Sequence, residues 1–343
     1  MENRKIRVAI NGFGRIGRAF LKIAWENPEI EVVAVNDLGT IESLSYLLQY
    51  DTVYRKWKEP VRHEDGNIII GGKPVRFVSE KDTTKLPWGD FDIDVVVEST
   101  GLFTAYDKAK FHLDCGAKKV VISAPAKAGE DAGVHGETIL LGVNEEKFGT
   151  CDITSNASCT TNAASPLISI LHDAIGIEKA ILNTVHGYTA SQALVDGPSK
   201  KDLREGRAAA QNIVPSSTGA AIAVTKAFPV LENKFDGISV RVPVPAGSIV
   251  DITFISKRET SREEVNEILT HASNDPHWKK IFSLTDEPLV SSDILGRSHA
   301  CIADLEMTRV VDGNLVKVMG WYDNEMGYTY TLVDHVIKTG RTI

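Results

Sequence analysis

One cysteine, Cys159, lies in a setting where its thiol could act as a nucleophile. The segment from Ser155 to Asn162 reads Ser-Asn-Ala-Ser-Cys-Thr-Thr-Asn and is followed by apolar residues at helical spacing between 167 and 171. A thiol at a helix N-terminus lies at the positive end of the helix dipole, which favours the thiolate that attacks carbonyl carbons. Because a lone cysteine is more often a small buried side chain, this assignment needs support from other residues.

A histidine in the same half of the chain could serve as the base for this thiol. The segment Thr184-Val-His186-Gly-Tyr-Thr189 places His186 where a strand ends and a loop begins. A nucleophilic cysteine needs a neighbouring group that takes its proton. Of the nine histidines, His186 is the best placed, so we expect Cys159 and His186 to form a catalytic pair.

Three glycines near the N-terminus predict a dinucleotide site. The segment Gly12-Phe-Gly14-Arg-Ile-Gly17 lies between an expected strand and an expected helix. There the glycines allow a tight turn and a close approach of the backbone to a pyrophosphate, which the helix N-terminus attracts. Asp37 ends the second strand, 20 residues after Gly17. An acid at that position bonds the ribose hydroxyls of NAD and repels the extra phosphate of NADP, so we expect NAD as the cofactor.

The elements that position these residues follow two patterns. The first half alternates strands with helices, which is typical of a doubly wound parallel sheet. We expect strands over 6–10, 30–35, 92–98 and 119–123, and helices over 15–25 and 108–115. After Asn162 a long helix precedes longer strands with hairpin-like gaps, over 180–185, 237–242, 249–255, 300–303 and 314–319. The fold class is therefore α/β plus α+β, an N-terminal doubly wound Rossmann domain followed by a second domain on a largely antiparallel sheet.

A chain of 343 residues suits two domains rather than one core. We expect an NAD-binding domain over 1–157 and a catalytic domain over 158–324, with a C-terminal helix, about 325–343, packing back on the first. The net charge of -8 disfavours a nucleic-acid binder. No apolar run could cross a membrane, and no secretory signal precedes the first strand. The four cysteines lack metal-ligand spacing, so we expect reduced thiols, no metal and a cytoplasmic location.

Six motifs in order give the chain a resemblance to phosphorylating glyceraldehyde-3-phosphate dehydrogenases. They are residues 11–18, 155–162, Val185-His-Gly-Tyr-Thr189, Ser217-Thr-Gly-Ala-Ala221, Arg241-Val-Pro243 and Trp321-Tyr-Asp-Asn-Glu325. The resemblance implies a two-step reaction in which the Cys159 thiolate attacks the aldehyde of glyceraldehyde 3-phosphate. His186 accepts the hydroxyl proton as a hydride passes to NAD, and inorganic phosphate then attacks the thioester to give 1,3-bisphosphoglycerate.

The resemblance also implies a role for further residues. The substrate's phosphate is expected at Thr189, Arg204 and Arg241, and the attacking inorganic phosphate at Ser158, Thr160, Thr218 and Gly219. The expected cofactor contacts are Gly12, Gly14, Arg15, Ile16, Asp37, Lys81, Ser123 and Asn324. The chain departs from the usual family pattern at Gly187 (alanine), Met326 (tryptophan) and Lys81 (arginine). Gly187 is expected to loosen the loop that holds Thr189, because glycine is conformationally permissive.

Two other functions compete with this interpretation. An erythrose-4-phosphate dehydrogenase would share the fold, the cysteine and the histidine, but members of that branch depart from the Tyr188-Thr189 pair that this chain keeps. A Rossmann-type binding module without significant catalysis would leave the intact catalytic set unexplained. The resemblance further implies a homotetramer, with the segment from Ser191 to Pro215 near a subunit interface.

Overall fold

The computed structural model describes residues 4–127, 129, 133–199 and 202–343. The chain divides into two compact units. The first unit comprises residues 1–139, 145–157 and 332–343, and the second comprises 140–144 and 158–331. The last division falls inside helix α8 (Met326–Gly340). None of the helices in the described part of the chain combines the length and hydropathy that a bilayer span requires.

The first unit is built on a nine-stranded sheet in the order β10-β11-β9-β8-β1-β2-β7-β6-β5. Its strands are β1 (Ile6–Asn11), β2 (Ile30–Asn36), β5 (Val61–Glu64), β6 (Asn67–Ile70), β7 (Lys73–Val78), β8 (Val95–Glu98), β9 (Lys119–Ile122), β10 (Gly136–Thr138) and β11 (Ile153–Ser155). The pairs from β10 to β7 are parallel, and β6 and β5 add an antiparallel edge. The short pair β3 (Tyr50–Asp51) and β4 (Arg55–Lys56) is separate.

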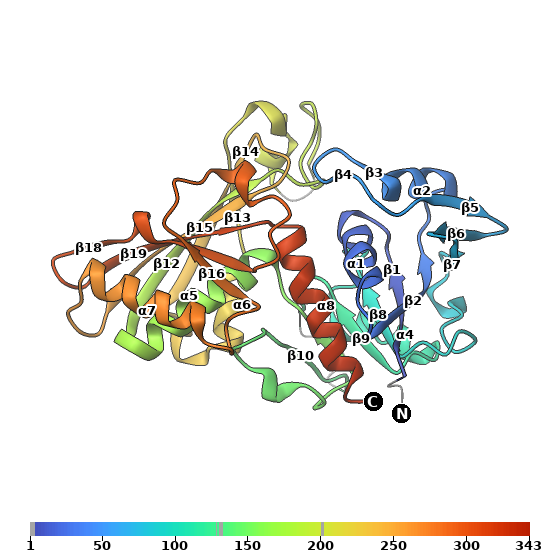
Figure 1. Cartoon of the computed structure of the whole chain (residues 1–343), viewed down its shortest axis with the longest axis horizontal. Coiled ribbons are helices and arrows are strands. Elements are labelled where there is room, and N and C mark those ends of the chain that lie inside the picture. Colours follow the sequence, from blue (N-terminus) through green and yellow to red (C-terminus); the bar gives the residue numbers. More distant parts are fainter. Residues whose placement is uncertain (1–3, 128, 130–132, 200–201) are drawn as a thin grey trace. The chain divides into compact units, whose positions relative to one another are not determined.

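The helices of this unit connect the parallel strands, as the alternation in the sequence predicts. They are α1 (Arg15–Trp25), α2 (Ile41–Gln49), α3 (Tyr106–Ala109) and α4 (Phe111–Asp114). Helix α1 packs on β2, close to β1 at the centre of the sheet (Figure 1). The single helix expected over 108–115 is wrong in detail, because Lys110 separates two short turns there. The antiparallel edge β5–β6 was not predicted, since four-residue strands give too short an alternation to recognise.

Parallel strands buried on both faces form the centre of this sheet. All four residues of β8 and of β9 are buried, which agrees with the apolar runs 95–97 and 120–122 within them. Residues 332–343, which comprise the second part of α8 and the three residues after it, belong to the same unit. Within it, His335 is fully buried and bonds Thr154 Oγ1 (2.8 Å) and Asn156 Oδ1 (3.1 Å). Burial lowers the pKa of His335 to about 3, so its ring is neutral and anchors β11.

The second unit is built on an eight-stranded sheet in the order β13-β14-β12-β15-β19-β17-β16, with β18 paired to β19. Its strands are β12 (Ile177–Gly187), β13 (Val214–Ser217), β14 (Phe235–Val242), β15 (Ser248–Ser256), β16 (Phe282–Thr285), β17 (Cys301–Asp304), β18 (Arg309–Val311) and β19 (Leu315–Tyr322). Two pairs, β12–β14 and β16–β17, are parallel and the other pairs are antiparallel. The sheet is therefore largely antiparallel, as predicted.

Three helices cover one face of this sheet. They are α5 (Cys159–Ile175), α6 (Ala220–Ala227) and α7 (Arg262–Asn274). Helix α5 contacts β12, β15, β17 and β19, and α6 and α7 flank it (Figure 1). Gly320 of β19 permits this close packing, since a Cβ there would lie 3.0 Å from Leu167 Cδ1 and 2.6 Å from Cys301 Sγ. The N-terminus of α5 is thereby held against the sheet.

Candidate active site

Cys159 is the first residue of α5. The N-cap residue Ser158 accepts a hydrogen bond from Thr161 N (3.0 Å), which satisfies one of the free N–H groups of the first turn. The preceding residue, Ala157, is buried and has a φ of +55°, a left-handed conformation that costs a non-glycine residue about 1–2 kcal/mol. This turn carries the chain from β11 into α5 and presents Cys159 at the helix N-terminus.

Cys159 and His186 lie side by side in the second unit. The distance from Cys159 Sγ to His186 Nε2 is 3.4 Å, which is a hydrogen-bonding contact for sulfur. His186 comes from β12, one residue before the strand ends, and its side chain lies on the same face as Leu182 and Thr184. The sheet contacts α5 on that face, so the strand pleat directs His186 toward the first turn of the helix.

Burial and charge keep this pair neutral at rest. Burial, aided by the Arg241 guanidinium, lowers the pKa of His186 to about 4. Burial also raises the pKa of the Cys159 thiol, although the Thr160 hydroxyl and Arg241 act in the opposite direction. In the resting site desolvation therefore opposes the preference for the thiolate that a helix N-terminus gives. A neutral imidazole beside a thiol is instead ready to accept the thiol proton.

The other ring nitrogen of His186 has two neighbours that compete for it. His186 Nδ1 lies 2.6 Å from Gly187 O and 2.6 Å from Arg241 Nη1. A guanidinium N–H can only donate, so while Arg241 bonds Nδ1 the proton of a neutral His186 is on Nε2, facing Cys159. When Nδ1 instead donates to Gly187 O, Arg241 Nη1 must turn from the ring toward Gly187 O, 3.4 Å away, and Nε2 is unprotonated. This second tautomer makes His186 a base toward the sulfur.

Tyr322 joins the two elements that carry the pair, and the sequence reasoning missed it. Its buried hydroxyl lies 2.9 Å from Thr160 Oγ1 on α5 and 2.8 Å from Thr184 Oγ1 on β12. Its ring stands edge-on to the His186 ring, with the centroids 5.9 Å apart. Burial raises the pKa of Tyr322, so the hydroxyl keeps its proton. The signal was present, because Tyr322 lies in the motif Trp321–Glu325 at a buried position of an alternating strand.

Each residue expected at the substrate's phosphate bonds a different neighbour. Arg241 pairs with His186 across the parallel strands β12 and β14, which places its guanidinium beside the catalytic pair. Its Nε is buried and has no hydrogen-bond partner among the described residues. Thr189 Oγ1 lies 3.0 Å from Ser191 Oγ. Arg204 is 61% exposed and bonds Asp202 through Nε and Nη2, and no bond among the described residues joins it to Arg241 or Thr189.

The residues expected at the inorganic phosphate lie at the N-termini of two helices. The hydroxyl of Ser158 caps α5, and that of Thr160 is directed at Tyr322. Thr218 Oγ1 accepts a bond from Ala220 N (3.2 Å) at the start of α6. Gly219 is the N-cap of α6 without a side-chain cap, and a Cβ there would meet open space. Free N–H groups at such a terminus attract anions.

The glycine loop of the first unit has the geometry of a dinucleotide site. Gly12 has a φ of +94° and lies so close to Thr100 that a Cβ would come within 2.6 Å of its backbone nitrogen. Gly14 is the N-cap of α1 with no side-chain cap, and open space lies at its Cβ position. Asp37 directly follows β2, where Oδ2 accepts from Phe13 N (2.7 Å) and Oδ1 from Gly39 N (2.8 Å). An uncapped helix start beside an acid suits pyrophosphate and ribose hydroxyls.

The remaining cofactor candidates of this unit lie around the same edge or on its surface. Arg15 and Ile16 are the first two residues of α1, and the Arg15 side chain forms an ion pair with Asp51 (3.1 Å). Ser123 follows β9 and donates its N–H to Glu98 O (2.9 Å). Lys81 is exposed after β7. This exposed position does not by itself support a contact between the Lys81 side chain and the cofactor.

Asn324 lies in the second unit, two residues after the end of β19. Its Oδ1 accepts from Gly247 N (2.9 Å) and Ser248 Oγ (3.1 Å), which orients the amide and leaves Nδ2 as the group that could bind a ligand. Met326 begins α8, and its N–H bonds Asp323 Oδ1 (2.9 Å). At Gly187 an added Cβ would lie 3.0 Å from Val244 O. The glycine therefore permits a close approach of the backbone to Val244 O, and the loosening of the loop that holds Thr189 stays a prediction.

Comparisons with known proteins agree with this arrangement. Residues 6–106 match the family described as "Glyceraldehyde 3-phosphate dehydrogenase, NAD binding domain", and residues 158–324 match its "C-terminal domain". The chain is 47% identical to glyceraldehyde-3-phosphate dehydrogenase 2 of Streptomyces arenae, over 98% of this chain and 99% of the relative. It is 46% identical, with the same coverage, to glyceraldehyde-3-phosphate dehydrogenase 1 of Bacillus subtilis. The chain therefore belongs to the glyceraldehyde-3-phosphate dehydrogenase family.

Proposed function

We propose that this protein is an NAD-dependent enzyme of glycolysis and gluconeogenesis that oxidises and phosphorylates D-glyceraldehyde 3-phosphate to 1,3-bisphosphoglycerate. The observation that carries the proposal is the thiol of Cys159, at a helix N-terminus, 3.4 Å from a neutral histidine. The matches to both domains of the family and the relatives of nearly full length support the same conclusion. Residues 1–157 would form the NAD-binding domain and residues 158–324 the catalytic domain.

The side chains of the pair account for the covalent steps. Cys159 Sγ bonds the aldehyde carbon while its proton passes to His186 Nε2 and then to the new oxyanion, which gives a hemithioacetal. The free N–H of Cys159, in the first turn of α5, suits that oxyanion. His186 next removes the hydroxyl proton, which favours departure of a hydride and formation of the thioester. A phosphate oxygen then attacks the thioester carbon, the C–S bond breaks, and the Cys159 thiolate regains its proton from His186.

Arginine side chains and free N–H groups at helix N-termini support two phosphate sites. One would hold the substrate's phosphate and the other the attacking inorganic phosphate. Arg241 carries a buried, unpartnered Nε beside His186, and a guanidinium binds phosphate oxygens in a fork. We assign Arg241, Thr189 and Arg204 to the substrate's phosphate. Arg204 must exchange Asp202 for the phosphate to do so. The groups at Ser158, Thr160, Thr218 and Gly219 are assigned to the attacking phosphate.

The dinucleotide edge of the first unit supports NAD as the cofactor. When bound, NAD supplies the acceptor for the hydride that leaves the substrate. The N–H groups of Arg15 and Ile16 at the start of α1 would hold the pyrophosphate, and Asp37 would hold the ribose hydroxyls. Asp37 uses one oxygen for Phe13 and one for Gly39, and each oxygen retains a further lone pair for a hydroxyl. The remaining assignments are Ser123 and Asn324 to the nicotinamide and, without support from its position, Lys81 to the adenosine.

The proposal is tested by following reduced nicotinamide absorbance with glyceraldehyde 3-phosphate, with and without inorganic phosphate. We expect sustained turnover only with phosphate, and a burst followed by a stall without it, because the thioester then accumulates. NADP should replace NAD poorly, since Asp37 repels its extra phosphate. Equal turnover without phosphate would remove the acyl-phosphate product from the proposal. A higher rate on erythrose 4-phosphate would assign the enzyme to that aldehyde instead.

Exposed apolar side chains in the second unit support a homotetramer. Leu194, Val195, Leu203 and Ile213, all in the segment 191–215, are 72–85% exposed, and Ile181 and Ile238 are more than half exposed on the sheet face opposite α5. Exposed apolar clusters of this kind mark surfaces that other chains cover. Light scattering on the purified protein should give four times the mass of one chain. A mass equal to one chain at micromolar concentration would contradict the tetramer.

A further inference from the structure

Three polar residues lie in one row across the carboxyl edge of the first sheet. Asn11, Asn36 and Glu98 are the last residues of β1, β2 and β8. Asn11 pairs with Asn36 on one side and with Glu98 on the other, so the three are direct neighbours in the sheet. All are at least nine-tenths buried. The glycine loop starts directly after Asn11, and Asp37 directly after Asn36.

The Glu98 carboxylate is the end point of two chains of hydrogen-bond donors. Asn36 Nδ2 donates to Asn11 Oδ1 (2.8 Å), and Asn11 Nδ2 donates to Glu98 Oε2 (2.7 Å). On the other side, Trp88 Nε1 donates to His112 Nδ1 (2.9 Å), and His112 Nε2 lies 3.0 Å from Glu98 Oε2. An indole can only donate, so the proton of His112 must be on Nε2 and directed at Glu98. Burial lowers the pKa of His112, which agrees with this neutral ring.

The other oxygen of Glu98 holds the loop that packs against the glycine loop. Glu98 Oε1 accepts from Thr100 N (2.8 Å) and from the Thr100 hydroxyl. Thr100 is the residue whose backbone lies against Gly12, and Ser99 Oγ donates to Gly12 O (2.7 Å). Glu98 therefore contacts both supports of the glycine loop, the Asn11–Asn36 pair on one side and Thr100 on the other.

We propose that Glu98 is a positioning residue for the dinucleotide, which shapes the glycine loop through Asn11 and Thr100 while His112 and Trp88 hold its carboxylate in place. The proposal rests on the proposed NAD site. Replacing the carboxylate with an amide puts an NH2 group where only acceptors fit. In Glu98→Gln that NH2 faces either the donors of Thr100 or those of Asn11 and His112, so one side of the loop must shift.

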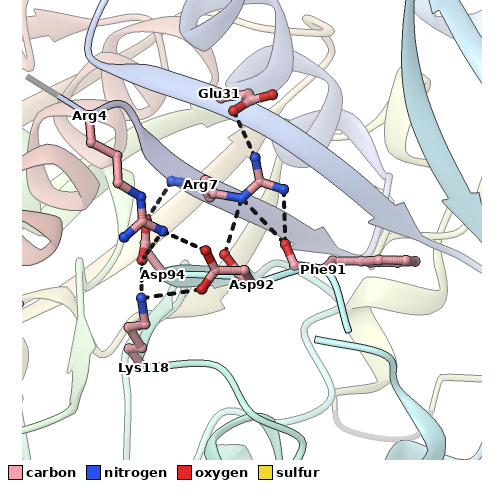
Figure 2. A network of polar contacts seen from close by, with 7 residues as sticks. All are labelled: Arg4, Arg7, Glu31, Phe91, Asp92, Asp94 and Lys118. Carbon is pink, nitrogen blue, oxygen red and sulfur yellow. Dashed lines mark hydrogen bonds and ion pairs between the residues drawn. The ribbon is translucent and has the colours of Figure 1, made fainter. Parts of the chain in front are cut away.

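A second buried carboxylate at the opposite end of the same strand provides a matched control. Asp94 immediately precedes β8 and accepts from Arg7 N (2.9 Å) and Lys118 Nζ (2.7 Å), within a network that includes Arg4 and Asp92 (Figure 2). It is 4% exposed, as deeply buried as Glu98 at 2%. This network lies at the amino end of β8, away from the row of carboxyl-end residues. Asp94→Asn should therefore lower stability without affecting the cofactor site.

The test measures the Kd for NAD by calorimetry on the intact protein, together with the melting temperature. We expect Glu98→Gln to raise the Kd at least about tenfold and Asp94→Asn to change it less than about twofold, although both lower the melting temperature. Equal effects of the two variants on the Kd, or an unchanged Kd in Glu98→Gln, would overturn the proposal. Nitrogen NMR of His112 adds an independent readout, since the amide should disturb its Nε2–H signal.

A milder variant keeps the test decisive if Glu98→Gln does not fold. Thr100→Val removes the hydroxyl bond to Glu98 and the bond that the hydroxyl accepts from Leu102 N (3.1 Å), and Thr100→Ser retains both. We expect about a threefold to tenfold rise in Kd for valine and recovery with serine. Identical Kd values for the two would contradict the positioning role. A native protein that binds no NAD at all would contradict the proposed function itself, which separates the two failures.

Discussion

Cys159→Ser should lose about 10⁴-fold in turnover of glyceraldehyde 3-phosphate while it still binds NAD. A serine hydroxyl is a far weaker nucleophile than a thiol, and it would stand in the same desolvated position that already raises the pKa of the thiol. His186 can take a proton from Sγ across 3.4 Å, but a serine hydroxyl is a much weaker acid than a thiol and is not converted to a comparable nucleophile by the same base. The measurement is steady-state reduction of NAD, with the Kd for NAD determined in parallel.

Cys151→Ser is the matched control for this prediction. Cys151 is a half-buried thiol of the first unit whose Sγ lies 3.2 Å from Ile153 O, and it forms no disulfide. We expect its turnover to stay within about twofold of the native value. Sustained turnover by Cys159→Ser, or an equal loss in both variants, would show that Cys159 is not the nucleophile.

The sequence predicts well those parts of the site whose residues all lie in one short segment of the chain. The helix α1 has the bounds expected from its periodicity, and the glycine loop lies between β1 and α1 as its spacing requires. Asp37 follows β2 and bonds the loop at Phe13. These features depend on a strand, a turn and a helix that are adjacent in the chain, so local residue types determine them.

Contacts between distant segments could not be read from the sequence in this way. Arg241 stands beside His186 because β12 and β14 pair in parallel with these residues in register, 55 positions apart. The sequence suggests each strand but not their register. Tyr322 reaches Thr160 only because β19 and the start of α5 meet in the folded unit. Likewise, the sequence does not show that Arg204 pairs with Asp202 and must release it to bind a phosphate.

Burial changes the expected protonation state of the catalytic pair. Sequence reasoning places Cys159 at a helix N-terminus and therefore favours a thiolate. In the folded unit desolvation raises the thiol pKa and lowers that of His186, so the resting pair is neutral. The degree of burial depends on how α5 packs on the sheet, which no local pattern reports. The neutral pair makes proton transfer to His186 part of the reaction.

His186→Asn tests that conclusion through the pH dependence of the rate. Because the pKa of His186 is lowered to about 4, the native base stays neutral above that pH and loses activity only as the pH falls toward 4. For the native protein, kcat/KM for the aldehyde should therefore show no fall near pH 6.5 that is due to protonation of His186. The variant should be about 10²- to 10⁴-fold slower at pH 7.

The two profiles should also differ in slope above neutral pH. Without a base the variant depends on the thiolate fraction, which rises about tenfold per pH unit up to the raised pKa of Cys159. Its rate should therefore climb through pH 9, while the native rate stays flat. Tyr322→Phe is the control, because it keeps the ring beside His186 and removes the hydroxyl bonds to Thr160, Thr184 and Ser248. Tyr322→Phe should be slower than the native protein but show the same dependence of rate on pH. If the pH profiles of the native protein and of His186→Asn were parallel, His186 would not be the group that accepts the thiol proton.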